Sequence, residues 1–245
     1  LYMLRSPVVV GNWKMHGGCA FIEDFFAKFG NSDLATEVAV LLPYIYLQQA
    51  QNMLKGSKIK WGAQNISEHG SGAYTGEISA SMLQDFSCTY TLVGHSERRT
   101  LYNEANLTVA SKFFMALKSG IKPILCVGES LDARENDDTF TVIESQCRAV
   151  FEHDDFPEYC SQGFLIAYEP VWSIGTGKVP STDQVQDVHE FIRGTLGKFN
   201  NEIAKRTRIL YGGSLNPGNC KNIFNCPDVD GGLVGGASLD PSTFR

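Results

Sequence analysis

The stretch GFLIAYEPVWSIGTGK, residues 163–178, combines two features that decide the fold. Its first half is a nearly continuous apolar run that ends in Glu169, and such a run is typical of a strand covered on both faces, as in a parallel sheet. Its second half contains proline and glycine, which are typical of a loop. The stretch therefore predicts a buried strand with a carboxylate at its end and a glycine-containing loop beside it.

Seven further apolar runs of this kind lie along the chain. They are VVVGNW (8–13), VAVLLP (38–43), IKWGAQ (59–64), YTLVGH (90–95), KPILCVGE (122–129), RILYGG (208–213) and DGGLVGG (230–236). Helical patterns lie between most of them. Eight strands that alternate with helices predict an α/β protein, a closed (β/α)8 barrel with parallel strands. An open, doubly wound sheet has the same alternation, because alternation alone does not show closure.

Two of the intervening segments have clear helical patterns. In 181–196, either Ser181 or Thr182 can cap the helix N-terminus, and one apolar stripe follows at three- and four-residue steps. In 106–120 a second stripe precedes Gly120, which is a typical helix stop. The stripe residues are Val185, Val188, Ile192 and Leu196 in the first segment, and Leu107, Ala110, Phe114 and Leu117 in the second.

Composition predicts one globular domain that covers residues 1–245. Hydrophobic residues make up 43% of the chain and charged residues 20%, which is enough for a large core. There is no low-complexity segment or linker, and only PSTFR follows SLD at the C-terminal end, so the last helix is expected to be short or incomplete. The net charge of −6 argues against nucleic acid and anionic membranes as partners, since both favour a basic face.

The seven cysteines and the N-terminal segment predict a cytoplasmic protein. The number of cysteines is odd and no Cys-x-x-Cys pair occurs, so a reducing compartment is favoured over a disulfide scaffold or a zinc ribbon. LYMLRSPVVVGNWK lacks the apolar core of a signal peptide. No stretch approaches the ~18 apolar residues of a membrane span.

Reactive side chains follow several predicted strands, where barrels of this kind build their active sites. Glu169 is fixed from behind by Pro170, and a partly desolvated carboxylate there can take a carbon-bound proton. His95 ends the run 90–95, and the SERR that follows can open a helix. Because a helix N-terminus disfavours a charged imidazolium, a neutral imidazole can donate a hydrogen bond to a carbonyl there.

Lys14 follows the first run, together with Asn12. An inward-facing ammonium at this place offsets the charge of a phosphate and of a developing enediolate oxygen. The alternative for Lys14 is a Schiff-base role, because aldolases on barrels use lysine in this way.

Two glycine clusters end the seventh and eighth runs, GGS at 212–214 and GG at 235–236. Small residues let backbone N–H groups approach an anion, and a short helix that follows adds its positive end. Phosphate sites after strands seven and eight recur in this barrel. The clusters therefore predict phosphate binding, to which Ser214 can add a hydroxyl.

With these residues in place, the sequence resembles the triosephosphate isomerase family. The matching segments are GNWKM (11–15), AYTGEIS (73–79), VGHSERR (93–99), CVGE (126–129), AYEPVWSIGTGK (167–178), YGGS (211–214) and LVGGASL (233–239). They span nearly the whole chain in family order and spacing, and they imply the family's fold, the TIM barrel.

The resemblance implies a chemical role for four residues. Glu169 is expected to move a proton between the two carbons of an enediolate that links dihydroxyacetone phosphate with glyceraldehyde 3-phosphate. His95 is expected to polarise the carbonyl and shuttle protons between the oxygens, while Lys14 supplies fixed positive charge and Asn12 a neighbouring polar group. The resemblance implies no metal and no organic cofactor.

Further residues are implied to bind the substrate or to support the site. The substrate-binding set is Asn12, Trp13, Lys14, Gly175, Ser214, Gly235 and Gly236, and the supporting pair is Ser96 and Glu97.

The loop that follows Glu169 resembles the family's lid. Its residues are Pro170, Val171, Trp172, Ser173, Ile174, Gly175, Thr176, Gly177 and Lys178. Closure of this lid is expected to exclude water, which strengthens the electrostatics of the site, and to protect the enediolate from loss of phosphate.

The polar segment 64–79 implies a homodimer. In the family this loop reaches into the partner subunit, with the residue that matches Thr75 near the partner's active site. Glu77 and Arg98 are expected to form an ion pair across that contact, in an assembly with C2 symmetry.

Two rival functions keep the same barrel. One is a Schiff-base phosphosugar aldolase that uses Lys14, and the other is a phosphate-binding barrel protein without isomerase turnover. The second would predict damage to the set Glu169, His95 and Lys14, which is intact.

Overall fold

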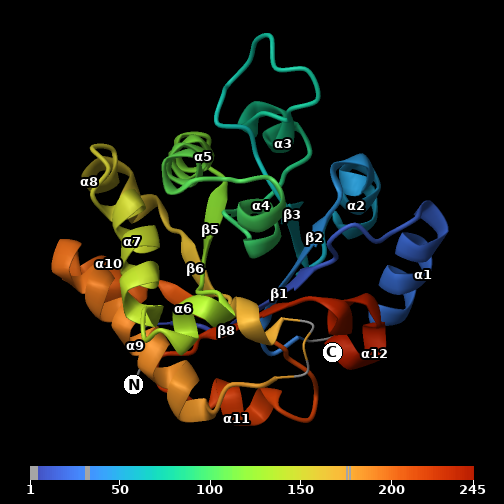
Figure 1. The fold of residues 1–245 in the computed structure, drawn as a ribbon. Coiled ribbons are helices and arrows are strands. Elements are labelled where there is room, and N and C mark those ends of the chain that lie inside the picture. The colour runs from blue at the N-terminus through green and yellow to red at the C-terminus, as the bar shows by residue number, and fades with distance from the viewer. Residues whose placement is uncertain (1–4, 31–33, 175, 177) are drawn as a thin grey trace.

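The computed structural model describes residues 5–30, 34–174, 176 and 178–245 (Figure 1). Its eight strands form a closed barrel in the order β1 to β8, and all pairs, including β1 with β8, are parallel. The predicted closed barrel is confirmed and the open sheet is excluded. The strands are β1 (Val8–Asn12), β2 (Glu37–Leu42), β3 (Lys60–Ala63), β4 (Tyr90–Val93), β5 (Lys122–Val127), β6 (Leu165–Tyr168), β7 (Arg208–Tyr211) and β8 (Gly231–Val234).

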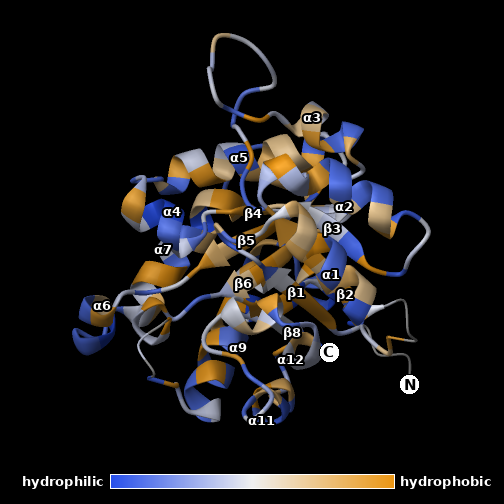
Figure 2. Cartoon of the chain, turned by 90° about the vertical axis from the view of Figure 1, so that its right-hand side faces the viewer, coloured by the Kyte–Doolittle hydropathy of each residue, from blue (hydrophilic) through white to orange (hydrophobic). Residues whose placement is uncertain are grey.

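Helices surround the barrel and connect its strands (Figure 1). The α-helices are α1 (Cys19–Phe29), α2 (Leu47–Leu54), α3 (Ala80–Asp85), α4 (Ser96–Leu101), α5 (Asn106–Lys118), α6 (Leu131–Glu135), α7 (Thr139–Phe151), α8 (Phe156–Tyr159), α9 (Thr182–Phe199), α10 (Asn201–Arg206), α11 (Cys220–Phe224) and α12 (Pro241–Phe244). Four short 3-10 helices are η1 (Tyr44–Tyr46), η2 (Cys160–Gln162), η3 (Val171–Ser173) and η4 (Gly236–Leu239). Figure 2 shows the apolar interior and the polar outer faces of these helices.

Two apolar clusters explain why the strand sequences are unbroken aliphatic runs. In β6, Leu165 and Ala167 belong to the cluster inside the barrel, while Ile166 and Tyr168 pack in the layer between strands and helices. Because successive side chains point to opposite faces of a strand, both faces require apolar residues when both are covered.

Both predicted helices are present, but one residue of a predicted apolar stripe is not buried. In α9 the whole predicted stripe is buried, and Ser181 caps the helix reciprocally with Gln184. In α5, however, Leu107 is 78% exposed, because the packed part of the helix begins at Val109. Gly120, with φ +74°, follows the end of α5 as predicted.

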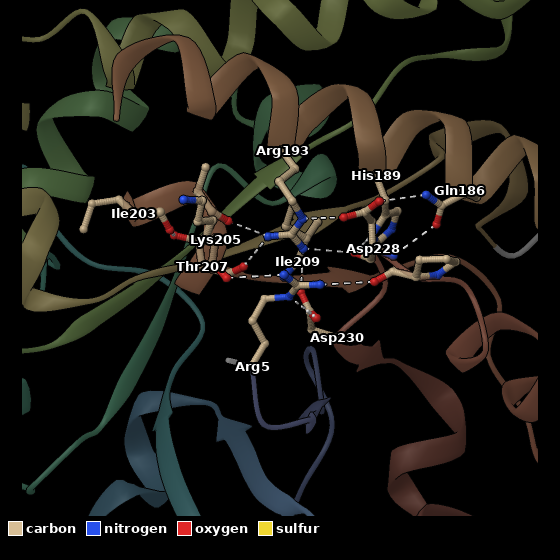
Figure 3. Close-up of polar contacts among 12 residues, drawn as sticks. Arg5, Gln186, His189, Arg193, Ile203, Lys205, Thr207, Ile209, Asp228 and Asp230 are labelled. Carbon is tan, nitrogen blue, oxygen red and sulfur yellow. Dashed lines mark hydrogen bonds and ion pairs between the residues drawn. The ribbon is translucent and has the colours of Figure 1, made fainter. Parts of the chain in front are cut away.

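A polar network anchors α9 at the amino-terminal end of the barrel (Figure 3). Arg193 forms ion pairs with Asp228 at 2.5 Å and Asp230 at 2.8 Å, and donates to the carbonyl oxygens of Ala204 and Thr207. The side chains come from α9 and from the segment that leads into β8, and the two carbonyl groups come from α10 and from the residue before β7. These elements are therefore joined far from the carboxyl ends of the strands.

No helix in the described part of the chain is long and apolar enough to cross a membrane. The seven cysteines are all free thiols.

Candidate active site

A cavity of about 270 Å³ lies at the carboxyl ends of the strands. It is lined by Asn12, Lys14, His95, Glu169, Ile174, Gly212, Gly213, Ser214, Leu215, Leu233, Gly235 and Gly236. These residues end or follow strands β1, β4, β6, β7 and β8, which are far apart in sequence. The structure thus brings the proposed base, imidazole, ammonium and glycine clusters together around one space.

Glu169 is 2% exposed and follows β6 directly. Its backbone N–H donates to the carbonyl oxygen of Val127 at 2.7 Å, which fixes its place beside β5. The carboxylate accepts from the backbone N–H of Ser96 at 3.1 Å and lies 2.8 Å from Nε2 of His95. Burial alone would raise the pKa of this carboxyl, but His95 and the Ser96 N–H outweigh it and lower the pKa. These contacts favour the ionised form of Glu169, which can accept a proton.

His95 is buried and caps the N-terminus of α4. Its Nδ1 accepts a hydrogen bond from the backbone N–H of Glu97 at 3.2 Å. Burial lowers the pKa of the imidazole and the Glu169 carboxylate raises it, with a net rise. A proton on Nδ1 would nevertheless set one N–H group against another, so this geometry favours a neutral ring that carries its proton on Nε2. That Nε2 then donates to Oε1 of Glu169 at 2.8 Å, while Nδ2 of Asn12, which is itself a donor, lies 3.3 Å away.

Lys14 has a left-handed backbone, with φ +53°. Two side chains hold this conformation: Asn12 Oδ1 accepts from the Lys14 N–H at 3.0 Å, and Gln64 donates to the Lys14 carbonyl at 2.9 Å. The ammonium forms an ion pair with Glu97 at 2.6 Å. A non-glycine residue in this region costs on the order of 1–3 kcal/mol, and such residues cluster at functional sites.

The glycine clusters bring bare backbone to the cavity wall. At Gly213 a Cβ would overlap the hydroxyl of Tyr211 and lie 2.9 Å from Ser173 Oγ. At Gly212 it would lie 3.0 Å from Cγ of Glu169. No side chain fits at either place without displacing its neighbours, so peptide groups form this part of the wall.

The predicted lid begins with η3 and is anchored at its start. Trp172 donates from Nε1 to Oε1 of Glu129 at 2.8 Å, and the carbonyl oxygen of Ser173 accepts from Ser214 Oγ at 2.9 Å. Thr176 Oγ1 donates to the Trp172 carbonyl at 2.8 Å and accepts from the N–H of Lys178. The predicted lid residues Gly175 and Gly177 lie outside the described residues, and so does the phosphate contact predicted for Gly175.

Glu129 is a functional candidate to which the sequence analysis assigns no role, although it ends the predicted strand 122–129. The side chain is fully buried and accepts hydrogen bonds from Tyr168, Trp172 and Arg134. A charged residue at the end of a buried strand is the signal that could have found it. It ties the start of the lid to β5 and β6.

The placement of Trp13 does not agree with the predicted substrate contact. Its side chain is fully buried and packs against Phe21, Phe25 and Phe26, away from the cavity wall. Since side chains alternate along a strand, Asn12 and Trp13 at the end of β1 point to opposite faces. Trp13 thus supports the site from the outer core.

The predicted dimer contacts lie outside the cavity. Thr75 and Glu77 are exposed, in the segment between β3 and α3 that stands out from the barrel in Figure 1. Arg98 forms an ion pair within the chain, with Glu104 at 2.6 Å, and its guanidinium lies over the ring of Tyr102.

In the described residues, no group of three or more His, Cys, Asp or Glu side chains could hold a metal ion.

The fold and the site define a class of protein, the (β/α)8-barrel enzymes whose acid–base groups stand at the carboxyl ends of the strands. Comparison with known proteins gives the particular family. The family model for triosephosphate isomerase matches residues 7–245. The chain is 48% identical over 245 residues to the triosephosphate isomerase of Methylococcus capsulatus, covering 98% of this chain and 96% of the relative. It is 49% identical to that of Nitrosomonas eutropha, covering 99% and 96%. The chain belongs to the triosephosphate isomerase family.

Proposed function

We infer that the protein is a triose-phosphate isomerase, which interconverts dihydroxyacetone phosphate and D-glyceraldehyde 3-phosphate in glycolysis and gluconeogenesis. Family membership over nearly the whole chain supports this function. The observation that carries it is the carboxyl group of Glu169, which lies 2.8 Å from Nε2 of His95 in a cavity that Lys14 and the glycine clusters also line.

The reaction needs one base that serves two carbons. Glu169 takes the proton from C1 of dihydroxyacetone phosphate, and the electron pair of the C–H bond moves toward the C2 carbonyl to give an enediolate. The same carboxyl group returns the proton to C2, and the aldehyde forms at C1. A proton moves from the oxygen on C1 to the oxygen on C2, so that the isomerisation is balanced without an external reactant.

His95 and Lys14 stabilise the charge that develops on oxygen. A neutral imidazole donates a hydrogen bond from Nε2 to the carbonyl and can pass that proton between the two oxygens. The ammonium of Lys14 offsets the negative charge of the enediolate and of the phosphate in a site with little water. Asn12 completes this wall and holds the backbone of Lys14. Ser96 and Glu97 support the pair, because Ser96 donates to Glu169 and Glu97 contacts both Lys14 and the His95 ring.

The phosphate is assigned to the wall formed by the glycine clusters, where Gly235 lies beside Lys14. Backbone N–H groups at Ser214, Gly235 and Gly236 and the start of η4 suit an anion, and Gly175 of the lid is assigned a further N–H contact. Lid closure over this wall would exclude water from the enediolate.

We also propose a homodimer with C2 symmetry. Several large apolar side chains lie exposed near a second cavity of about 550 Å³ that adjoins Lys14 and His95. They include Met15, Leu101 and Tyr102, which line this cavity, and Met15 is 94% exposed. In the proposed dimer, the projecting loop 64–79 of one copy packs on this surface of the other copy. Thr75 of the loop then lies near the active site of the other copy, and Glu77 of the loop lies toward the other copy's Arg98. Sedimentation at low micromolar concentration should give twice 27.0 kDa, and a mass near 27.0 kDa would contradict the dimer.

We also propose that residues 1–245 form one domain and that the protein is cytoplasmic. The proposed reaction uses no metal and no organic cofactor. The free cysteines support a reducing compartment.

The rival functions have distinct outcomes. A Schiff base at Lys14 needs a neutral amine, whereas its Nζ forms an ion pair with Glu97. A coupled assay with dihydroxyacetone phosphate should show rapid turnover, and borohydride should trap no adduct at Lys14. A folded protein that binds phosphate but does not turn over would favour the silent phosphate-binding barrel, and a trapped adduct would favour the aldolase.

A further inference from the structure

Arg99 of α4 is a part-buried arginine with no role in the reaction described above. Its Nε donates to the carbonyl oxygen of Gly94 at 2.8 Å, and its Nη2 donates to that of Cys126 at 3.2 Å. Its Nη1 donates to the side chain of Asn106 at 2.7 Å. One guanidinium therefore joins the end of β4, the end of β5 and the start of α5.

The two carbonyl groups belong to the backbone that carries the site. Gly94 immediately precedes His95 and has φ +71°, and a Cβ on it would lie 2.9 Å from Nη2 of Arg99. The guanidinium thus packs against a glycine that no larger residue could replace without strain. Cys126 is fully buried, and it lines a cavity of about 250 Å³ together with Arg99 and Glu169.

The charge of Arg99 has no close carboxylate partner. Its three acceptors are neutral oxygens, and among the described residues no carboxylate lies within ion-pair distance of it. The titratable groups around it are the thiols of Cys126 and Cys147 and the carboxylates of Glu169 and Glu104. A cation in a region of low dielectric favours the anionic form of a nearby carboxyl group.

Glu169 is the nearby carboxylate that serves as the base. The charged or titratable groups that face it are His95 from the end of β4 and Cys126 from β5, while Lys14 from the end of β1 stands in the wall of the same cavity. When His95 donates its hydrogen bond to the substrate, it no longer donates to Glu169 and no longer favours the ionised carboxylate. The positive charge of Arg99 stays in place and continues to favour it.

We propose that Arg99 is a positioning residue for the isomerisation: its hydrogen bonds fix the strand ends that carry His95 and stand behind Glu169, and its charge favours ionised Glu169. The inference rests on the proposed isomerase function. Lysine at this place keeps the charge but cannot reach three acceptors in different directions, whereas methionine removes both the charge and the donors.

The two variants separate these contributions. Arg99→Lys should lower kcat about tenfold or more with a small change in KM, because the catalytic groups are held less firmly. It should leave the acid limb of the pH profile of kcat, which reports groups in the substrate complex, in place. Arg99→Met should lower kcat further and move the acid limb upward by about half a pH unit or more. All rates are measured on dimer-sized, folded enzyme at a temperature well below its unfolding transition.

Arg193→Lys is the matched control. Arg193 also joins several segments through carbonyl oxygens, at the opposite end of the barrel (Figure 3). This control should lose thermal stability while kcat and the pH profile stay as in the wild type. If folded Arg99→Lys and Arg99→Met keep wild-type kcat and the same acid limb, the positioning role is wrong. If the wild type itself has no isomerase turnover, the proposed function fails instead.

Discussion

His189 of α9 should make the stability of the fold depend on pH in a way that one substitution removes. The ring is fully buried, and its Nδ1 lies 3.1 Å from the carbonyl oxygen of Asp228, in the network of Figure 3. Its Nε2 has no hydrogen-bond partner in the described part of the chain. Burial lowers the pKa of His189 to about 4, well below that of a solvated histidine.

The sign of the effect follows from where the proton binds. Between pH 6.5 and 4 the unfolded chain binds the proton and the folded chain does not, so stability falls as the pH falls through this window and the loss levels off below the folded pKa. With an unfolded pKa of 6.5, the folded state should lose about 1.2 kcal/mol between pH 7 and 5.5, and about 2.4 kcal/mol between pH 7 and 4.5, from this group alone.

The assay compares denaturant unfolding of the wild type and His189→Gln at pH 7, 5.5 and 4.5, at one fixed protein concentration. Glutamine keeps a donor for the Asp228 carbonyl and does not titrate, while the carboxylates of the chain titrate equally in both proteins. The two free energies of unfolding should therefore converge, or cross, as the pH falls. A difference between wild type and variant that is the same at all three pH values would show that His189 does not cause this pH dependence.

Three further predictions concern the cavity wall, the lid and a helix cap. Gly213→Ala should raise KM and lower the melting temperature, because the new methyl group displaces Tyr211 and with it the phosphate wall; steady-state kinetics that match the wild type would contradict this. Deletion of the lid tip, residues 173–177, should raise methylglyoxal formation relative to isomerisation, and an unchanged product ratio measured by chromatography would speak against the lid. Ser181→Ala should cost about 1 kcal/mol of stability in thermal unfolding through loss of the cap that it shares with Gln184, with little change in kcat.

The strands were predictable because a barrel covers both faces of every strand. Runs such as 163–169 carry apolar residues at successive positions, as a strand requires when one of its faces packs inside the barrel and the other packs against helices. The carboxyl ends of parallel strands then bring Asn12, His95 and Glu169 to the same side without further information. Closure into a barrel depends on pairing between β1 and β8, which no local pattern encodes.

The errors arose where local pattern and packing diverge. Leu107 fits the periodic stripe of α5 but precedes the part of the helix that meets the core. Trp13 stands between two cavity residues in sequence, yet strand alternation turns it toward the phenylalanines of α1. The role of Glu129 depends on hydrogen-bond partners from β6, η3 and α6. These partners are separated along the chain, so only the folded structure shows that they meet at one carboxylate.

We propose that Glu169 is the base and that its position sets the rate of isomerisation. Glu169→Asp keeps the carboxylate but withdraws it by one methylene from a cavity that His95 and Lys14 still line. The measurement is the coupled isomerisation of dihydroxyacetone phosphate by wild type and variant across a range of substrate concentrations. We predict rapid turnover by the wild type and a kcat about a hundredfold or more lower in the variant at similar KM, since displacement by about 1 Å has such a cost. Equal kcat values in two folded proteins would contradict the assignment of Glu169 as the base.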